Sequence, residues 1–167
     1  MSILESPRLL LVPLADEHLP GLHAINSDAA VMTYIGDGAP LSLQQSQLMI
    51  ATVRQHWAQR GMSWWALLDK HDGEMVGAAA LQPLSAHSSN PPEIGWRLRR
   101  ASWGRGYATE AASAIVDYAR RIGQRRLVAI AHPANVASLA VMHRLGMLYL
   151  GIEAYDISPC AVFELFL

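Results

Sequence analysis

A short glycine-containing stretch between a strand pattern and a helix pattern constrains this chain more than any other feature. It reads Trp103-Gly-Arg-Gly-Tyr-Ala-Thr-Glu110. Residues 93–98 before it alternate as a strand does, and residues 107–122 after it carry an apolar helical face. Two glycines two positions apart allow a tight turn and a close approach to a ligand. Because the first N–H groups of a helix lack partners and lie at its positive end, this stretch predicts a phosphate or pyrophosphate site.

The same stretch excludes two familiar nucleotide sites. The dinucleotide pattern G-x-G-x-x-G is incomplete because Thr109 occupies the third glycine position, and the P-loop pattern does not occur. The glycines alone leave two interpretations open, a plain turn before a helix or a nucleotide-like cofactor held by its phosphates.

Composition limits the class of protein. The chain has 167 residues, of which 51% are hydrophobic and 16% are charged, as expected for one globular domain covering residues 1–167. A net charge of −1 argues against a general nucleic-acid binder. A single cysteine, Cys160, suits a reducing cytoplasm, and no apolar run is long enough for a signal peptide or a membrane span. We expect a cytoplasmic protein that binds neither nucleic acid nor membrane.

Periodicity predicts a mixed α/β order of elements. Strands are expected at residues 8–14, 64–68, 74–81, 93–98, 126–131, 147–151 and 161–166. Helices are expected at residues 16–25, 42–61, 107–122 and 135–146, with a further helical turn within 27–34. Asp16 is a candidate N-cap of the first helix, and Ser42 with Gln45 has the spacing of a capping box at the second.

This order and four motifs resemble the GNAT superfamily of N-acetyltransferases, and within it the RimJ/RimL-like branch of ribosomal-protein N-terminal acetyltransferases. The motifs are Glu5-Ser-Pro-Arg8-Leu9, Glu93-Ile-Gly-Trp96, Trp103 to Ala111, and Asn135-Val-Ala-Ser138 followed by Leu145-Gly146. The resemblance implies an α/β fold whose central mixed sheet has about six to seven strands, flanked by about four helices. It also implies that the fourth and fifth strands splay apart.

The resemblance implies acetyl-CoA as co-substrate and no metal. The residues expected to bind the pyrophosphate through their backbone N–H groups are Gly104, Arg105, Gly106, Tyr107, Ala108 and Thr109. The splayed strand would pair with the pantetheine arm through Trp96, Arg97 and Leu98, and Asn135 would hydrogen-bond the same arm. Asn135 is also a candidate for a plain helix N-cap. Trp103 departs from the glutamine or arginine that usually opens the superfamily's cofactor signature.

Two residues are candidates for proton transfer. In the RimJ/RimL-like branch the serine at the position of Ser138 is implicated in protonating the leaving thiolate, and the tyrosine that many superfamily members use is here Met142. The alternative is that Ser138 only bonds locally in the first helical turn. Glu93 is a candidate relay for the amine's proton or else a solvated charge, and Glu153 is a second candidate. Glu110 is expected to stabilise the first turn of its helix.

The resemblance predicts direct acetyl transfer to a primary amine in a ternary complex, by a monomer or homodimer. A protein N-terminal α-amine is the expected acceptor, since with a pKa near 8 about a tenth is neutral at pH 7. The alternatives are an amino sugar, polyamine or amino acid, or a non-catalytic acyl-CoA-binding domain. The loops at residues 35–40 and 85–92 are expected to determine which acceptor binds. The aromatic residues that are candidates for the acceptor pocket are Tyr34, Trp64, Trp65, Trp96 and Tyr155.

Overall fold

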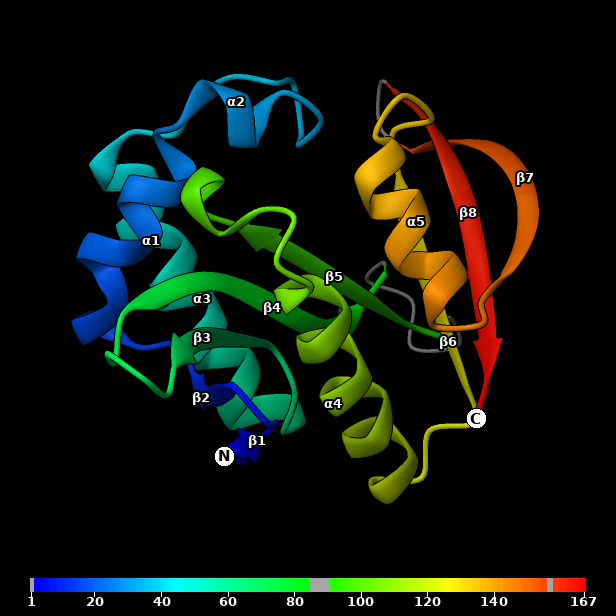
Figure 1. The fold of residues 1–167 in the computed structure, drawn as a ribbon, viewed down its shortest axis with the longest axis horizontal. Coiled ribbons are helices and arrows are strands. Elements are labelled where there is room, and N and C mark those ends of the chain that lie inside the picture. Colours follow the sequence, from blue (N-terminus) through cyan, green and yellow to red (C-terminus); the bar gives the residue numbers. More distant parts are fainter. Residues whose placement is uncertain (1, 85–90, 156–157) are drawn as a thin grey trace.

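The computed structural model describes residues 2–84, 91–155 and 158–167. Within these residues eight strands form one mixed sheet in the order β1-β2-β3-β4-β5-β6-β8-β7 (Figure 1). The strands are β1 (Leu4–Glu5), β2 (Leu9–Pro13), β3 (Trp64–Asp69), β4 (Met75–Pro83), β5 (Pro92–Leu98), β6 (Arg126–Ala131), β7 (Leu148–Tyr155) and β8 (Ser158–Phe166). The sheet has more strands than the six to seven expected because the two-residue β1 pairs with β2.

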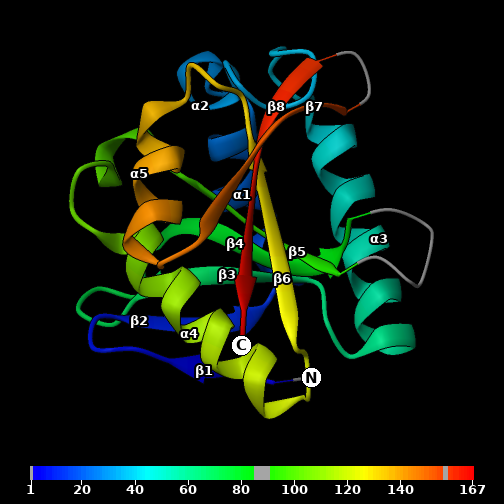
Figure 2. The same ribbon diagram turned by 90° about the vertical axis from the view of Figure 1, so that its right-hand side faces the viewer.

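The helices cover both faces of the sheet. In the described part of the chain they are η1 (Asp16–His18), α1 (Leu19–Asn26), α2 (Ala29–Met32), α3 (Leu43–Arg60), η2 (Arg100–Ser102), α4 (Tyr107–Arg121) and α5 (Val136–Arg144). Helices α4 and α5 lie together on one side of the sheet, and α3 lies on the other (Figure 2). The five α-helices exceed the four expected because the short segment after α1 forms a separate helix, α2, which Asp28 caps by accepting from the Ala30 N–H.

Local sequence signals account for the ends of the long helix α3. Ser42 accepts from the backbone N–H of Gln45 at 3.1 Å, and the Gln45 side chain accepts from the Ser42 N–H at 2.7 Å. This is the predicted capping box. Gly61 ends the helix with φ of 67°, a left-handed conformation that glycine adopts without strain.

The first predicted helix begins three residues later than expected. Residues 16–18 form the 3₁₀ turn η1, and α1 starts at Leu19 with His18 as its N-cap. Asp16 therefore does not cap α1 and instead forms an ion pair with Arg54 of α3. Pro20 lies in the first turn of α1, where a missing N–H costs nothing.

The core lies between the sheet and the helices on each face. The predicted apolar face of α4 is buried at Ala111, Ala112, Ile115 and Ala119, and its small alanine side chains let this helix lie close to the sheet. Trp65 of β3 makes edge-to-face contacts with Trp57 of α3 and with Tyr118 of α4. Within the described ranges no helix is both long enough and apolar enough to cross a membrane.

Candidate active site

Strands β5 and β6 part along most of their length. Their ladder has one register pair, Glu93 opposite Val128, whereas β4 and β5 pair from Pro83 and Pro92 through Gly77 and Leu98. These two strands are the fourth and fifth of the expected ones, so the predicted splay of the sheet is confirmed. The gap leaves one edge of β5 open in the middle of the sheet.

The backbone groups on this open edge belong to even-numbered residues. In an antiparallel ladder alternate residues direct their N–H and C=O groups to the same neighbour. The Arg99 N–H donates to the Val76 carbonyl at 3.0 Å, which places the groups of odd-numbered residues on the β4 side. Trp96 and Leu98 therefore direct their backbone groups to the gap, and Arg97 directs its groups to β4.

Trp103, the first residue of the glycine-containing stretch, closes the far end of this edge. Its indole Nε1–H donates to the Leu98 carbonyl at 3.0 Å, while the side chain is 47% exposed. Trp103 thus satisfies a backbone acceptor that the splay leaves without a strand partner. The part of the edge that an extended ligand can use is centred on Trp96.

A cavity of about 750 Å³ opens at the splay. Its walls come from residues 33–38 after α2, from β5, from the end of β6, from α5 and from β8. Four of the predicted site residues line it, namely Glu93, Trp96, Arg97 and Ser138. The other predicted site residues lie outside this lining: Leu98, Gly104, Arg105, Gly106, Tyr107, Ala108, Thr109 and Asn135.

Glu93 lies at the start of β5, in the cavity wall. Its Oε2 accepts from Nε2 of Gln82, on the neighbouring strand β4, at 3.3 Å. Burial raises the pKa of Glu93, and the hydrogen bond from Gln82 opposes this only in part. A carboxyl group with a raised pKa is suited to accept a proton near neutral pH. The prediction that Glu93 lines the cleft agrees with this position, and its chemical role stays a prediction.

Arg97 lies two residues beyond Gly95 on the same face of β5 as Glu93. Its guanidinium donates to Oδ1 of Asn26 at 2.7 Å and lies 5.0 Å from the ring centroid of Trp64. Burial lowers its pKa to about 10, so the group still carries its charge at neutral pH. Only the backbone of Arg97 was expected to contribute to the site, whereas the structure places its side chain in the cavity wall.

The start of α4 has the backbone geometry that the sequence predicts. Gly104 and Gly106 have φ of 71° and 80°, in the left-handed region that disfavours other residues. Gly106 is the N-cap, and no side chain accepts from the first turn of the helix in the described residues. The N–H groups of Tyr107, Ala108 and Thr109 are therefore available to an anion, as the first three of any helix are.

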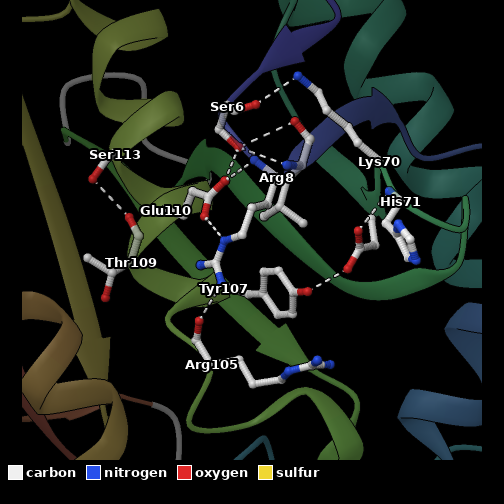
Figure 3. Close-up of polar contacts among 11 residues, drawn as sticks. Ser6, Arg8, Lys70, His71, Arg105, Tyr107, Thr109, Glu110 and Ser113 are labelled. Atoms are coloured by element: carbon white, nitrogen blue, oxygen red, sulfur yellow. Dashed lines mark hydrogen bonds and ion pairs between the residues drawn. The ribbon is translucent and has the colours of Figure 1, made fainter.

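The N-terminal segment holds the start of α4 in place (Figure 3). Glu110 accepts from the Ser6 hydroxyl at 2.6 Å and from the Arg8 backbone N–H and Nε, each at 2.7 Å. Arg8 also donates through Nη1 to the Arg105 carbonyl at 2.8 Å. Glu110 lies in the first turn as predicted, and it also joins this turn to the beginning of β2.

Tyr107 extends this contact to the β3–β4 turn. Its hydroxyl lies 2.5 Å from Oδ2 of Asp69, and the Arg8 guanidinium packs 4.5 Å from its ring centroid. The hydrogen bond from Tyr107 lowers the pKa of Asp69, and the same bond raises the pKa of the Tyr107 hydroxyl. The glycine turn is thus fixed from two sides before any ligand binds.

Helix α5 forms the opposite wall of the gap. Asn135 is its N-cap and accepts from the Ser138 N–H at 3.2 Å, as the N-cap alternative predicts. Ser138 and Met142 both line the cavity. Met142 has no proton to donate, so Ser138 is the hydroxyl that this helix presents to the cavity.

Among the aromatic candidates, Tyr34, Trp64 and Trp96 line the cavity, whereas Trp65 is fully buried in the core. Tyr155 was a fifth candidate, and its side chain lies outside what the structure describes. The Tyr34 ring stacks on His132, with centroids 5.2 Å apart. This contact joins the loop after α2 to the end of β6 across the splay.

The cavity wall also holds polar side chains that the sequence did not indicate, among them Gln82, His132 and Cys160. None of them falls in a recognisable motif, and they come together only through the strand order. Glu153 lies exposed on β7 and does not line the cavity. Residues 85–90 of the loop expected to influence acceptor choice lie outside the described residues. Within the described residues no group of three or more histidine, cysteine or acidic side chains could hold a metal.

Comparison with known proteins identifies the family. The profile of the Acetyltransferase (GNAT) domain matches residues 8–148. The chain belongs to the GNAT acetyltransferase family. GNAT acetyltransferases use acetyl-CoA and act on amine acceptors, so the open edge and the glycine turn belong to an acetyl-CoA-dependent N-acetyltransferase.

Two relatives show how far the sequence likeness extends. YkkB of Bacillus subtilis (strain 168) is 36% identical over 117 residues, which is 65% of this chain and 67% of the relative. The FsC-acetyl coenzyme A-N(2)-transacetylase of Aspergillus fumigatus is 29% identical over 171 aligned residues, covering 96% of this GNAT chain and 72% of the relative.

Solved structures share the whole fold. An acetyltransferase from Agrobacterium tumefaciens str. C58 superposes with a TM-score of 0.83 at 26% identity, covering 99% of this chain and 94% of that one. The ribosomal L7/L12 α-N-protein acetyltransferase RimL, solved with coenzyme A, has a TM-score of 0.82 at 21% identity, covering 99% and 98% of the two chains. The second likeness concerns the fold alone.

Proposed function

We propose that this protein transfers the acetyl group of acetyl-CoA to a primary α-amine, by direct attack in a ternary complex. The observation that carries the proposal is the open edge of β5 at Trp96, inside a cavity whose opposite wall presents Ser138. The pantetheine arm would pair with this edge and contact Asn135, and its pyrophosphate would rest on the N–H groups of residues 104–109. The residues present fit such a ligand, because Gly104 and Gly106 turn with positive φ into the start of α4, where no N-cap side chain accepts from the first N–H groups.

Glu93 and Ser138 are the proposed proton-transfer residues. Bound acetyl-CoA supplies the thioester, and attack by the neutral amine forms the N–C bond as the C–S bond breaks. Glu93 would take the proton that the amine loses, directly or through one water, because its raised pKa makes its carboxylate a stronger base. Ser138 would give a proton to the leaving thiolate from the opposite wall.

The expected acceptor class is a protein N-terminus, whose α-amine is partly neutral at pH 7. A small-molecule acceptor is the second candidate. It is supported by the name of the Aspergillus fumigatus relative, which specifies an N(2) position, and by polar side chains in the cavity wall. The third candidate is a domain that binds acyl-CoA but transfers no acyl group. For such a domain acetyl-CoA should bind, and no amine should be acetylated.

The proposal includes the setting in which the protein works. We propose one catalytic domain over residues 1–167, acting in the cytoplasm as a monomer or homodimer. The single cysteine, Cys160, suits a reducing compartment.

Thermal unfolding with acetyl-CoA tests the cofactor assignment first. At a concentration of a hundred times Kd a ligand stabilises by about 2.7 kcal/mol, or roughly 5–10 °C in Tm for a chain of this size. NADH, which also carries a pyrophosphate and an adenine, is the control. We expect a shift with acetyl-CoA alone. No shift at millimolar acetyl-CoA, or an equal shift with NADH, would contradict the proposal.

A further inference from the structure

The guanidinium of Arg97 is a largely buried positive charge in the wall of the cavity at the splay. Its neighbours are neutral: Oδ1 of Asn26 accepts from Nη1 at 2.7 Å, and Sδ of Met32 lies 4.0 Å from the same nitrogen. The indole of Trp64 lies under the group, with 5.0 Å between Cζ and the ring centroid.

No carboxylate in the described residues forms an ion pair with Arg97. Its Nε is buried and has no hydrogen-bond partner among residues 2–84, 91–155 and 158–167. Burial lowers the pKa only to about 10, so at neutral pH the charge persists. Buried charges in proteins are normally paired, since an isolated one costs several kcal/mol. An anion bound in this cavity would give the charge of Arg97 a partner.

A line of contacts connects Arg97 to Glu93 along the cavity wall. The Trp64 Nε1–H donates to Oε1 of Gln82 at 2.9 Å, and Gln82 Nε2 donates to Oε2 of Glu93 at 3.3 Å. Gly95, between the two charged residues on β5, presents no side chain, and a Cβ there would meet nothing closer than Glu93 Oε1 at 4.0 Å. The wall is thus polar at both ends and open in the middle.

We infer that the acceptor carries an anionic group, of which a carboxylate is the simplest, and that Arg97 binds this group while Glu93 faces the amine. The inference rests on the proposed acetyl transfer and narrows its acceptor class to amines that carry an acid. An amino acid and a peptide with an acidic side chain share this chemistry. The guanidinium suits a carboxylate because its planar donors can make two parallel hydrogen bonds.

A purely structural role makes a different prediction. The contact from Arg97 to Asn26 connects β5 to the end of α1, and Asn26 is itself fully buried and donates to Ser46. If Arg97 only held α1 against β5, its replacement would lower the stability of the fold and would change kcat/KM for acidic and neutral acceptors by the same factor. Charge recognition instead changes the ratio between acidic and neutral acceptors.

The test compares matched acceptors with matched variants. Acetylation rates are measured for an amino acid against its amide, and for a peptide with glutamate at its second position against the same peptide with glutamine. Each pair is assayed with the wild-type protein, Arg97→Gln, Arg97→Lys and Arg99→Gln. Arg99 is the control because it lies just beyond β5, pairs with Glu74 and does not line the cavity.

We expect the acidic-to-neutral ratio of kcat/KM for at least one pair to fall by about tenfold or more in Arg97→Gln, as for loss of a charged hydrogen bond. Arg97→Lys should retain part of the preference, and Arg99→Gln all of it. The acceptor pair whose ratio falls shows whether the acceptor is an amino acid or an acidic peptide. Equal ratios in wild type and Arg97→Gln would overturn the inference.

A binding measurement covers the case in which Arg97→Gln does not fold or no acceptor turns over. Tm is measured for the wild type with CoA plus each N-acetylated product, acidic or neutral. Stabilisation by an acidic product above its neutral match supports the inference. If the two products raise Tm equally while acetyl-CoA itself raises it, this inference is rejected and the proposed function still holds. No effect of acetyl-CoA rejects both.

Discussion

The carboxylate of Glu110 lies 2.7 Å from both the backbone nitrogen and Nε of Arg8, which joins the N-terminal segment to the first turn of α4. The same arginine donates to the carbonyl of Arg105, inside the glycine turn. The carboxylate is 14% exposed, and the arginine is 46% exposed. Because one acid satisfies three donors, the shape of the proposed pyrophosphate site depends on residues about a hundred positions apart in the chain.

We predict that Glu110→Gln lowers stability at neutral pH by about 1–3 kcal/mol, since it removes charged hydrogen bonds to a mostly buried group. Burial works to raise the pKa of Glu110, but the hydrogen bonds from Ser6 and Arg8 outweigh it, so the pKa is lowered. A lowered pKa in the folded state gives stability above the unfolded-state pKa, and this stability is lost as pH falls through the folded-state pKa.

Urea unfolding at pH 7 and at pH 4 or below checks this prediction. The difference between wild type and Glu110→Gln should be largest at pH 7 and should shrink toward acid pH. Asp117→Asn is the control on the same helix, because the ion pair of Asp117 with Arg120 is exposed and should contribute less than about 1 kcal/mol. A difference that does not depend on pH would show that the Glu110 charge is not what stabilises the turn.

A second prediction concerns Gly106. Gly106→Asp should weaken acetyl-CoA binding by more than tenfold, because it places a carboxylate where the pyrophosphate is proposed to lie. Gly106→Asn adds the same Cβ and a side chain of the same shape without the charge, and both asparagine and aspartate tolerate a positive φ better than other residues do. Calorimetric titration with acetyl-CoA should therefore show the larger loss for Gly106→Asp. Equal affinities of wild type and both variants would refute the phosphate site.

Much of the fold follows from local signals in the sequence. The capping box of Ser42 and Gln45, the alanine face of α4 and the glycines at positions 104 and 106 each depend on neighbours within a few residues. The splay between β5 and β6 was expected through resemblance, because no pattern within either strand reveals that they part. The 3₁₀ turn before α1 could not be predicted, because aspartate is a favoured N-cap residue and nothing near Asp16 in the sequence shows that its side chain pairs with Arg54.

The side-chain arrangement of the site could not be predicted in the same way. Glu93, Trp96 and Arg97 follow each other on one strand, so their faces could be assigned from alternation. The contacts of Arg97 with Asn26 and Trp64, and that of Tyr34 with His132, join residues far apart in the sequence. These depend on the strand order and on where α1 and α2 lie, which periodicity does not determine.

A third prediction separates stability from activity at Glu93. Burial raises its pKa, so ionised Glu93 destabilises the fold, and the stability of the protonated form is lost as pH rises through the folded-state pKa. Glu93→Gln should therefore raise Tm at pH 7–8 by about 2–4 °C, equivalent to about 1 kcal/mol, and should change it little at acid pH. The same change should lower kcat/KM by about a hundredfold and remove the acidic limb of its pH profile.

The Glu93 prediction is checked with Tm and with kcat/KM, each measured across pH 5–9 for wild type and Glu93→Gln. Gln82→Ala is the companion variant, because it removes the donor to Glu93 without touching the carboxyl group. It should move the acidic limb to higher pH, since the hydrogen bond from Gln82 lowers the pKa of Glu93. An acidic limb that persists unchanged in Glu93→Gln would assign the proton relay to another group.

The last prediction separates the two interpretations of Ser138. Its N–H is already used by Asn135 in the cap, and Ser138→Ala keeps that N–H, so the helix start should survive. If the hydroxyl protonates the leaving thiolate, kcat should fall by about ten- to a hundredfold or more while acetyl-CoA affinity stays the same. Steady-state acetyl transfer and acetyl-CoA titration measure the two quantities. Ser113→Ala is the control, because Ser113 lies on the exposed surface of α4, where its hydroxyl donates to the Thr109 carbonyl. A kcat equal to that of wild type would mean that Ser138 only bonds locally in the first turn of α5. Water in the cavity would then protonate the thiolate.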